Sequence, residues 1–209
     1  MFKKYDRKDT NQSVYCYSGT DIYKNKFKIM NSIRLSEVES DFASNRLIEM
    51  TIKPIRGKFG TAHFLRIHKY IFQDVYYFAG KIREEDIFKG DTFFCKCEYI
   101  KSSLDRVLLK LKSEEYLKNC NDTNIASRLA FYMSELNMIH PFREGNGRTI
   151  REFIRILAYK NNYIINWHNV DSAMLLKATI LAADFQYNLL EECIMIALGI
   201  SSDIKNNNQ

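Results

Sequence analysis

Residues 140–151 read His140-Pro141-Phe142-Arg143-Glu144-Gly145-Asn146-Gly147-Arg148-Thr149-Ile150-Arg151. A histidine can accept a proton, and a carboxylate can hold a divalent cation. Glycine amides can face phosphate oxygens, and arginines can neutralise the charge that remains. Core packing alone rarely collects these residue types in one window. The segment therefore indicates a site for a metal-bound polyphosphate.

Helical patterns flank this segment on both sides. Upstream, apolar residues recur at helical spacing from Ile125 to Ile139, and Pro141 disfavours helix at His140. Downstream, Ile150, Phe153, Ile154 and Leu157 form an apolar stripe, with Arg148 and Arg151 on another face. The free amides and the positive dipole end of a helix N-terminus bind anions. The pattern thus predicts a helix, an anion-binding glycine loop and a second helix.

The rest of the chain is mostly helical in pattern, and its two prolines are consistent with long helices. The first helix carries Ile29, Ile33, Val38, Phe42 and Leu47 among charged residues. Strand-like sequence is confined to about 84–97. We predict a mainly α class with one hairpin, and helices near 28–50, 61–78, 99–117, 123–139, 146–160, 171–183 and 187–199.

The segment resembles the signature of the Fic (filamentation induced by cAMP) family, His-x-Phe-x-(Asp/Glu)-Gly-Asn-Gly-Arg-x-x-Arg, at every defined position. Residues 67–83 resemble a second family stretch, and residues 86–94 resemble the family's flap hairpin. The likeness covers about residues 30–195 and is greatest to short bacterial Fic proteins. It implies a Fic-type helical bundle with a short β-hairpin flap. The expected division is an N-terminal extension (1–27), a catalytic domain (28–200) and a polar tail (201–209).

This resemblance implies a protein adenylyltransferase, which moves AMP from ATP to a Ser, Thr or Tyr hydroxyl and releases pyrophosphate. By the same resemblance His140 is the general base, with a pKa near its ordinary value, and Glu144 holds Mg²⁺. The flap, about residues 87–94, presents the target by strand addition. The implied phosphate-binding residues are Arg143, Gly145, Asn146, Gly147, Arg148 and Arg151, and the implied target-binding residues are Lys89, Gly90, Asp91, Thr92 and Phe93.

The sequence also allows other interpretations. A lone histidine before proline is usually a turn residue, and an Asn-Gly pair usually marks a tight turn. The scaffold also serves related phosphotransferases or other nucleotidyltransferases, although a kinase-like branch of the family has lysine where this chain has Gly147. A nucleotide-binding interaction protein without catalysis is the third alternative.

Regulation is inferred from a missing motif. Many Fic proteins carry an inhibitory (Ser/Thr)-x-x-x-Glu-(Gly/Asn) helix whose glutamate pairs with the second motif arginine, here Arg151. This chain lacks that motif. We therefore expect an unpaired Arg151 and a small separate antitoxin that supplies the glutamate, as in toxin–antitoxin pairs. Unregulated activity is the alternative. Short relatives modify type II topoisomerases, which makes such an enzyme a candidate target.

Composition limits the remaining classes. The chain has 209 residues, enough for one domain. Its net charge is +6, but the basic residues are dispersed along the chain, so no nucleic-acid binding is expected. No apolar run approaches the roughly 20 residues that span a bilayer, and no signal peptide is evident. Five cysteines without a metal-site pattern suit a reducing cytoplasm. His63, His68 and His168 are interpreted as structural. The apolar 187–199 segment is assigned to the core, with a homodimer contact as the alternative.

Overall fold

The structure is a computed structural model that describes residues 12–200. A mainly α fold with one hairpin is confirmed. Strands β1 (Phe88–Lys89) and β2 (Thr92–Phe93) are antiparallel, with Phe88 opposite Phe93. Within the described range, no helix has both the length and the apolarity needed to cross a bilayer. The helices are α1 (Ser32–Ile52), α2 (Thr61–Phe72), α3 (Ile100–Ser113), α4 (Ile125–Ile139), α5 (Asn146–Lys160), α6 (Ser172–Ala183) and α7 (Asn188–Leu198).

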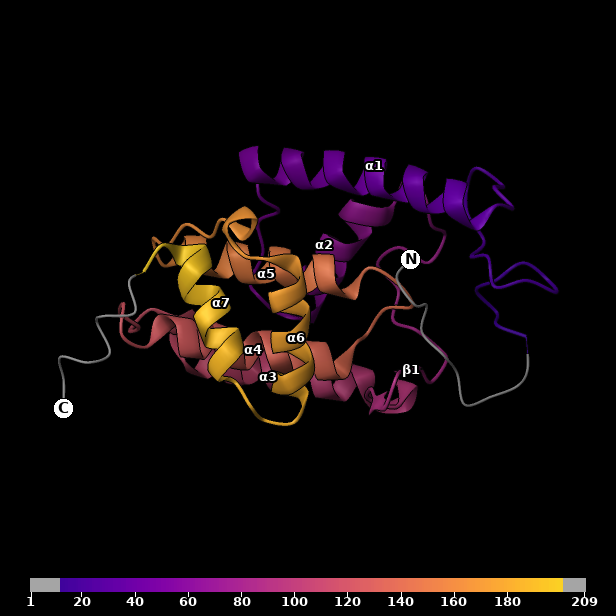
Figure 1. Ribbon diagram of the computed structural model, residues 1–209. Helices are drawn as coiled ribbons and strands as arrows, with labels where there is room; N and C mark the ends of the chain where they lie inside the picture. The colour runs from indigo at the N-terminus through magenta and orange to yellow at the C-terminus, as the bar shows by residue number, and fades with distance from the viewer. Residues whose placement is uncertain (1–11, 201–209) are drawn as a thin grey trace.

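Helix α4 is the centre of the bundle. It packs against α3, α5, α6 and α7, and Figure 1 shows α1 lying across the top of the molecule above α2 and α5. Leu129, Tyr132 and Leu136 of α4 are completely buried. Helix α7 buries Leu190, Cys193 and Ile194 against this core, so core burial of the 187–199 segment is confirmed. The homodimer alternative stays a prediction.

The second helix is shorter than its apolar pattern predicts, ending at Phe72 instead of 78. Residues 73–80 form turns with one bridge residue, Tyr76, because the N-terminal segment pairs with them: Lys26 N–H donates to the Val75 carbonyl at 2.9 Å, and Asn25 forms a bridge with Tyr76. Val75 and Tyr76 are buried as apolar residues of a helix would be. Hydrophobic spacing therefore identified the buried side chains but not the backbone that carries them.

Helix α3 also ends earlier than predicted, at Ser113 rather than 117, because Glu115, Tyr116 and Leu117 have φ angles of 51°, 58° and 66°. Left-handed backbone of this kind cannot continue an α-helix.

Helix α1 does not face the core with Ile33 and Phe42, two of the apolar residues that its pattern predicts to be buried. Ile33 is 62% exposed and Phe42 36%, whereas Leu35, Glu39, Ala43 and Met50 are buried. These four positions follow one another at helical spacing on one face. A glutamate in that buried row requires a polar partner.

The described part of the N-terminal extension, residues 12–27, packs against the bundle. Cys16 and Tyr23 belong to the core, and Asn25 is completely buried. The domain boundaries at 27 and 200 stay predictions. Residues 1–11 of the extension and the polar tail at 201–209 lie outside the described residues.

Candidate active site

A cavity of about 620 Å³ opens between the ends of α4 and α5, the flap and α6. Five predicted site residues line it together: His140, Gly147 and Arg151 from the motif, and Lys89 and Thr92 from the flap. Trp167, His168 and Leu176 contribute to the opposite wall. The predicted site residues that do not line the cavity are Arg143, Glu144, Gly145, Asn146, Arg148, Gly90, Asp91 and Phe93.

His140 is the C-cap of α4 and has left-handed backbone angles, φ 47° and ψ 60°. Its ring is stacked beneath Phe94, with centroids 3.8 Å apart. Nδ1 lies 2.8 Å from the Asn137 carbonyl. A carbonyl only accepts hydrogen bonds, so we assign the proton to Nδ1 and the basic lone pair to Nε2. The ring is therefore oriented as a base toward the cavity.

Burial lowers the pKa of His140 to about 3, and only 4% of the residue is exposed. The expectation of an ordinary pKa is thus wrong, because desolvation disfavours the imidazolium. The ring is neutral at physiological pH, as a general base must be. A polyanion in the cavity would raise this pKa, since negative charge stabilises the protonated ring.

The loop between α4 and α5 requires one of its glycines for conformation. Gly145 has φ 81°, and a Cβ there would lie 2.3 Å from the Phe72 ring. Asn146 closes the loop: its Oδ1 accepts from the Phe142 N–H at 2.9 Å and its Nδ2 donates to the Phe142 carbonyl at 2.7 Å. Asn146 is completely buried. Its side chain supports the loop instead of facing the cavity.

His68 of α2 supports the same loop from below. Its Nε2 lies 2.9 Å from the Glu144 carbonyl, its Nδ1 lies 2.8 Å from the Gly80 nitrogen, and Phe142 stacks on its ring at 3.7 Å. The Gly80 N–H must donate to Nδ1, so Nε2 carries the ring proton. Burial lowers the pKa of His68 to about 3. Both ring nitrogens are used, which is consistent with a structural histidine.

The Glu144 carboxylate is partly buried, and its charge is partly compensated by neighbouring groups. It accepts from the Gly145 N–H at 2.8 Å and lies 3.8 Å from Arg148 Nη2. Burial raises the pKa of Glu144, and the nearby Glu39 carboxylate raises it further. A divalent cation would stabilise the ionised form of such a group. Because Mg²⁺ needs only one or two carboxylates beside phosphates and water, Glu144 fits a magnesium ligand.

The two helical arginines of the motif differ in their surroundings. Arg151 lines the cavity, and within residues 12–200 no carboxylate lies within ion-pair distance of it. Gly147 leaves room beside it, since a Cβ there would be 3.4 Å from Arg151 Nη1. Arg148 instead pairs with Glu39 at 2.5 Å and covers the Phe72 ring.

Glu39 is a site neighbour that motif reasoning missed. It is 9% exposed, and it accepts hydrogen bonds from Tyr76 and Arg148. The available signal was its position: it lies four residues after Leu35 and four before Ala43, in the buried row of α1. A charged residue at such a position indicates a buried partner.

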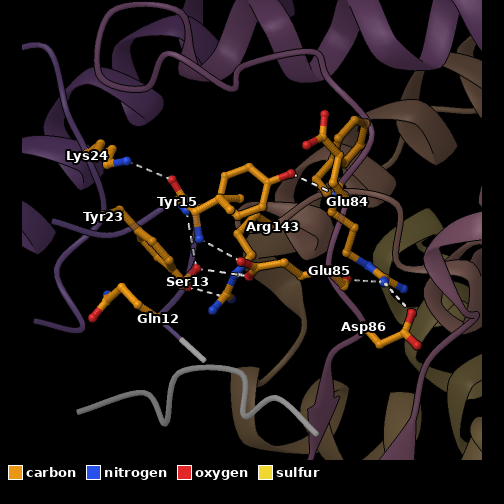
Figure 2. Close-up of polar contacts among 12 residues, drawn as sticks. Gln12, Ser13, Tyr15, Tyr23, Lys24, Glu84, Glu85, Asp86 and Arg143 are labelled. Carbon is orange, nitrogen blue, oxygen red and sulfur yellow. Dashed lines mark hydrogen bonds and ion pairs between the residues drawn. The ribbon is translucent and has the colours of Figure 1, made fainter. Parts of the chain in front are cut away.

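Arg143 points away from the cavity. Its guanidinium contacts other protein groups, and these contacts are inconsistent with direct binding of a phosphate. Its Nη1 donates to the Tyr23 hydroxyl at 2.8 Å, and its Nε lies 3.5 Å from the Glu85 carboxylate. Figure 2 shows Glu85 between Arg143 and the N-terminal segment, where Ser13 Oγ donates to it at 2.9 Å and Val14 N–H at 2.7 Å. Arg143 thus anchors the loop between α4 and α5 to residues 12–27.

The flap is a short exposed hairpin over the cavity. Gly90 at its turn has φ 58°, Phe93 is 55% exposed, and the Phe88 and Phe93 rings are 5.3 Å apart. Lys89 and Thr92 turn toward the cavity. Each of its two strands has only two residues.

Comparisons with known proteins agree with this arrangement. A profile of the Fic/DOC family matches residues 58–158. The chain is 40% identical over 166 residues to protein adenylyltransferase VbhT of Bartonella schoenbuchensis, an alignment that covers 79% of this chain and 35% of that protein. It is 32% identical over 166 residues to the probable protein adenylyltransferase Fic of Escherichia coli, covering 79% and 82% of the two chains.

Solved structures share the fold. BepC of Bartonella tribocorum, with bound AMPPNP, superposes with a TM-score of 0.80 at 22% identity, covering 88% of this chain and 95% of that one. A Fic domain from Bartonella quintana with bound ADP superposes with a TM-score of 0.81 at 23% identity, covering 88% and 93%.

Proposed function

The chain belongs to the Fic/DOC family, and we propose that it is a protein adenylyltransferase that transfers AMP from ATP to a hydroxyl side chain of a target protein. One observation carries the proposal: the neutral, oriented His140 lines the same cavity beneath the flap as Arg151, which has no ion-pair partner within residues 12–200. A base at the cavity can take the proton of the target's hydroxyl, and a cation at the same cavity can pair with the phosphates of ATP. The relatives named as adenylyltransferases support this assignment.

In the proposed reaction the target's hydroxyl oxygen attacks the α-phosphorus of ATP. A new oxygen–phosphorus bond forms, the bond from the α-phosphorus to the bridging oxygen breaks, and pyrophosphate leaves. Nε2 of His140 takes the hydroxyl proton. The stacked Phe94 and the Asn137 carbonyl hold the ring, so the nucleophile and base meet with little loss of orientational freedom.

The phosphates would lie near the N-terminus of α5. Arg151 would pair with their terminal charge, and Gly147 keeps the space beside its guanidinium clear. The free amides of the helix N-terminus add further donors. Glu144 would hold Mg²⁺, which would neutralise phosphate charge. For Arg143 we propose a supporting role through Tyr23 and Glu85 in place of phosphate binding.

The flap would orient the target. Its short strands would pair with an extended target segment, while Lys89 and Thr92 face the cavity where the hydroxyl must arrive. Gly90, Asp91 and Phe93 are exposed and do not line the cavity, so they would contact the target only.

Labelled ATP tests the function. The chain is incubated with a bacterial lysate and ATP labelled at either the α or the γ phosphate. Label from the α position on a protein band supports adenylyl transfer. Label from the γ position alone supports a phosphotransferase, and binding without any label supports an interaction protein. Either of the last two results rejects the proposal.

We also propose that a separate protein regulates the enzyme by placing a glutamate against Arg151. The absence of an ion-pair partner for that side chain within residues 12–200 supports this. Copurification from the native source tests it: a chain that is always alone and fully active contradicts it. A type II topoisomerase is the first target to assay, and the ATP-containing cytoplasm is the compartment we propose.

A further inference from the structure

Arg83 is a completely buried cation whose partners are backbone carbonyls. Its side chain is 0% exposed. Nε donates to the His140 carbonyl at 2.8 Å, Nη1 to the Glu85 carbonyl at 2.6 Å, and Nη2 to the Cys95 carbonyl. The nearest carboxylate, Asp86, is 3.9 Å away and 43% exposed. The guanidinium therefore acts mainly as a rigid fork of donors and only weakly as an ion-pair partner.

These carbonyls come from segments that the reaction must bring together. His140 supplies the base, Cys95 follows the flap, and Glu85 precedes it. The Arg83 backbone N–H also donates to the Pro141 carbonyl at 2.8 Å. Arg83 thus joins both ends of the flap to the residues that end α4.

The backbone at His140 requires such support. Its φ of 47° places a non-glycine residue in the left-handed region, which is tolerated only where the surroundings hold it. Arg83 accomplishes this with one donor to His140 and one to Pro141. The same fork sets the distance between the base and the flap above it.

Figure 2 shows that Glu85 extends these contacts to the N-terminal segment. Glu85, whose carbonyl Arg83 binds, uses its carboxylate to bind Ser13, Val14 and Arg143. The carbonyl and the carboxylate of Glu85 therefore connect the N-terminal segment, the start of the flap and the loop between α4 and α5.

We propose that Arg83 is a positioning residue that fixes the flap and the His140 base relative to each other. The inference rests on the proposed function, in which the flap presents the hydroxyl that His140 deprotonates. A displacement of about 1 Å between reacting groups lowers a rate by about 100-fold. Arg83 contacts no cavity-lining atom that would hold ATP, so its loss should affect turnover more than nucleotide binding.

The test compares Arg83→Lys with Arg155→Lys. Lysine keeps the charge and loses the planar fork. Arg155 is a matched control: it is 15% exposed, donates to the Met50 carbonyl at 3.0 Å and does not line the cavity. For Arg83→Lys we expect kcat to fall about 100-fold with KM for ATP within about threefold. Arg155→Lys should keep both values near those of the unaltered chain.

Hydrogen exchange gives a readout that does not need activity. In Arg83→Lys the amides of residues 86–95 should exchange about tenfold faster, while the amides of α4 and α5 exchange as in Arg155→Lys. Unchanged flap exchange, or a kcat within threefold of the unaltered chain, overturns the inference. If the unaltered chain transfers no AMP but the exchange result holds, the proposed function fails and the positioning role stands.

Asp86→Asn guards against a variant that does not fold. Asp86 is half-exposed, lies 3.9 Å from Arg83 and accepts from the Cys97 N–H at 2.7 Å. The substitution removes the charge of Asp86 and so weakens its contact with Arg83, without leaving an empty buried site. We expect the same pattern at smaller size, about a fivefold fall in kcat with faster flap exchange. Equal kcat and equal exchange in this variant contradict the role of Arg83.

Discussion

Acidification should destabilise the fold through His68, which is completely buried and uses both ring nitrogens. Protonation would place a second hydrogen on Nδ1, directly against the Gly80 N–H. The pKa is about 3 in the fold and about 6.5 in the unfolded chain. Between those values the unfolded chain binds more protons, so the free energy of unfolding falls as pH falls, by about 1.4 kcal/mol per pH unit. From pH 7.5 to 5.0 this amounts to about 2 kcal/mol.

The assay is urea unfolding, followed by circular dichroism at pH 7.5, 6.5, 5.5 and 5.0, for the unaltered chain and His68→Gln. Glutamine keeps an amide donor for the Glu144 carbonyl and does not titrate. Other groups, including His140 with its lowered pKa and Glu144 with its raised pKa, contribute equally to both chains and cancel in the difference. The unaltered chain should lose about 2 kcal/mol more than the variant. Equal losses would refute the assignment of His68 as a buried neutral ring.

Three further perturbations test the loop. Gly145→Ala should lower the free energy of unfolding by about 3 kcal/mol, because its Cβ would lie 2.3 Å from the Phe72 ring at a positive φ; unchanged urea unfolding contradicts the strain. Arg143→Ala should lower the melting temperature through the lost Tyr23 contact, with a Kd for ATP within about threefold by calorimetry; a larger loss of affinity would restore Arg143 as a phosphate ligand. Glu144→Gln should weaken ATP binding about tenfold with Mg²⁺ and little without it, and equal weakening under both conditions argues against a metal ligand.

The sequence predicted the elements that carry the site better than their surroundings. Helices α4 and α5 begin and end within about two residues of their expected bounds, because Pro141 and the glycine loop mark those ends locally. The predicted second helix was too long because Val75 and Tyr76 are buried like apolar residues of a helix, although they pair with residues 25 and 26. A pairing partner so distant along the chain leaves no local signal.

The site residues also differ in whether the sequence alone could identify them. His140, Gly147 and Arg151 could be found from motif order, since the chemistry requires them on one short segment. Glu39 and Arg83 act through contacts 109 and 57 residues away along the chain, which spacing cannot reveal. The pKa of His140 was also beyond sequence reasoning, because burial beneath Phe94 sets it.

The role of His140 as the base for AMP transfer is the central assignment. The direct measurement is transfer of the α-label from ATP to target protein by the unaltered chain and by His140→Ala, with ATP binding of both measured by calorimetry. We predict that the variant binds ATP with a Kd within about threefold of the unaltered chain and loses transfer by at least about 100-fold. Transfer that persists in His140→Ala would contradict the role of His140 as the base.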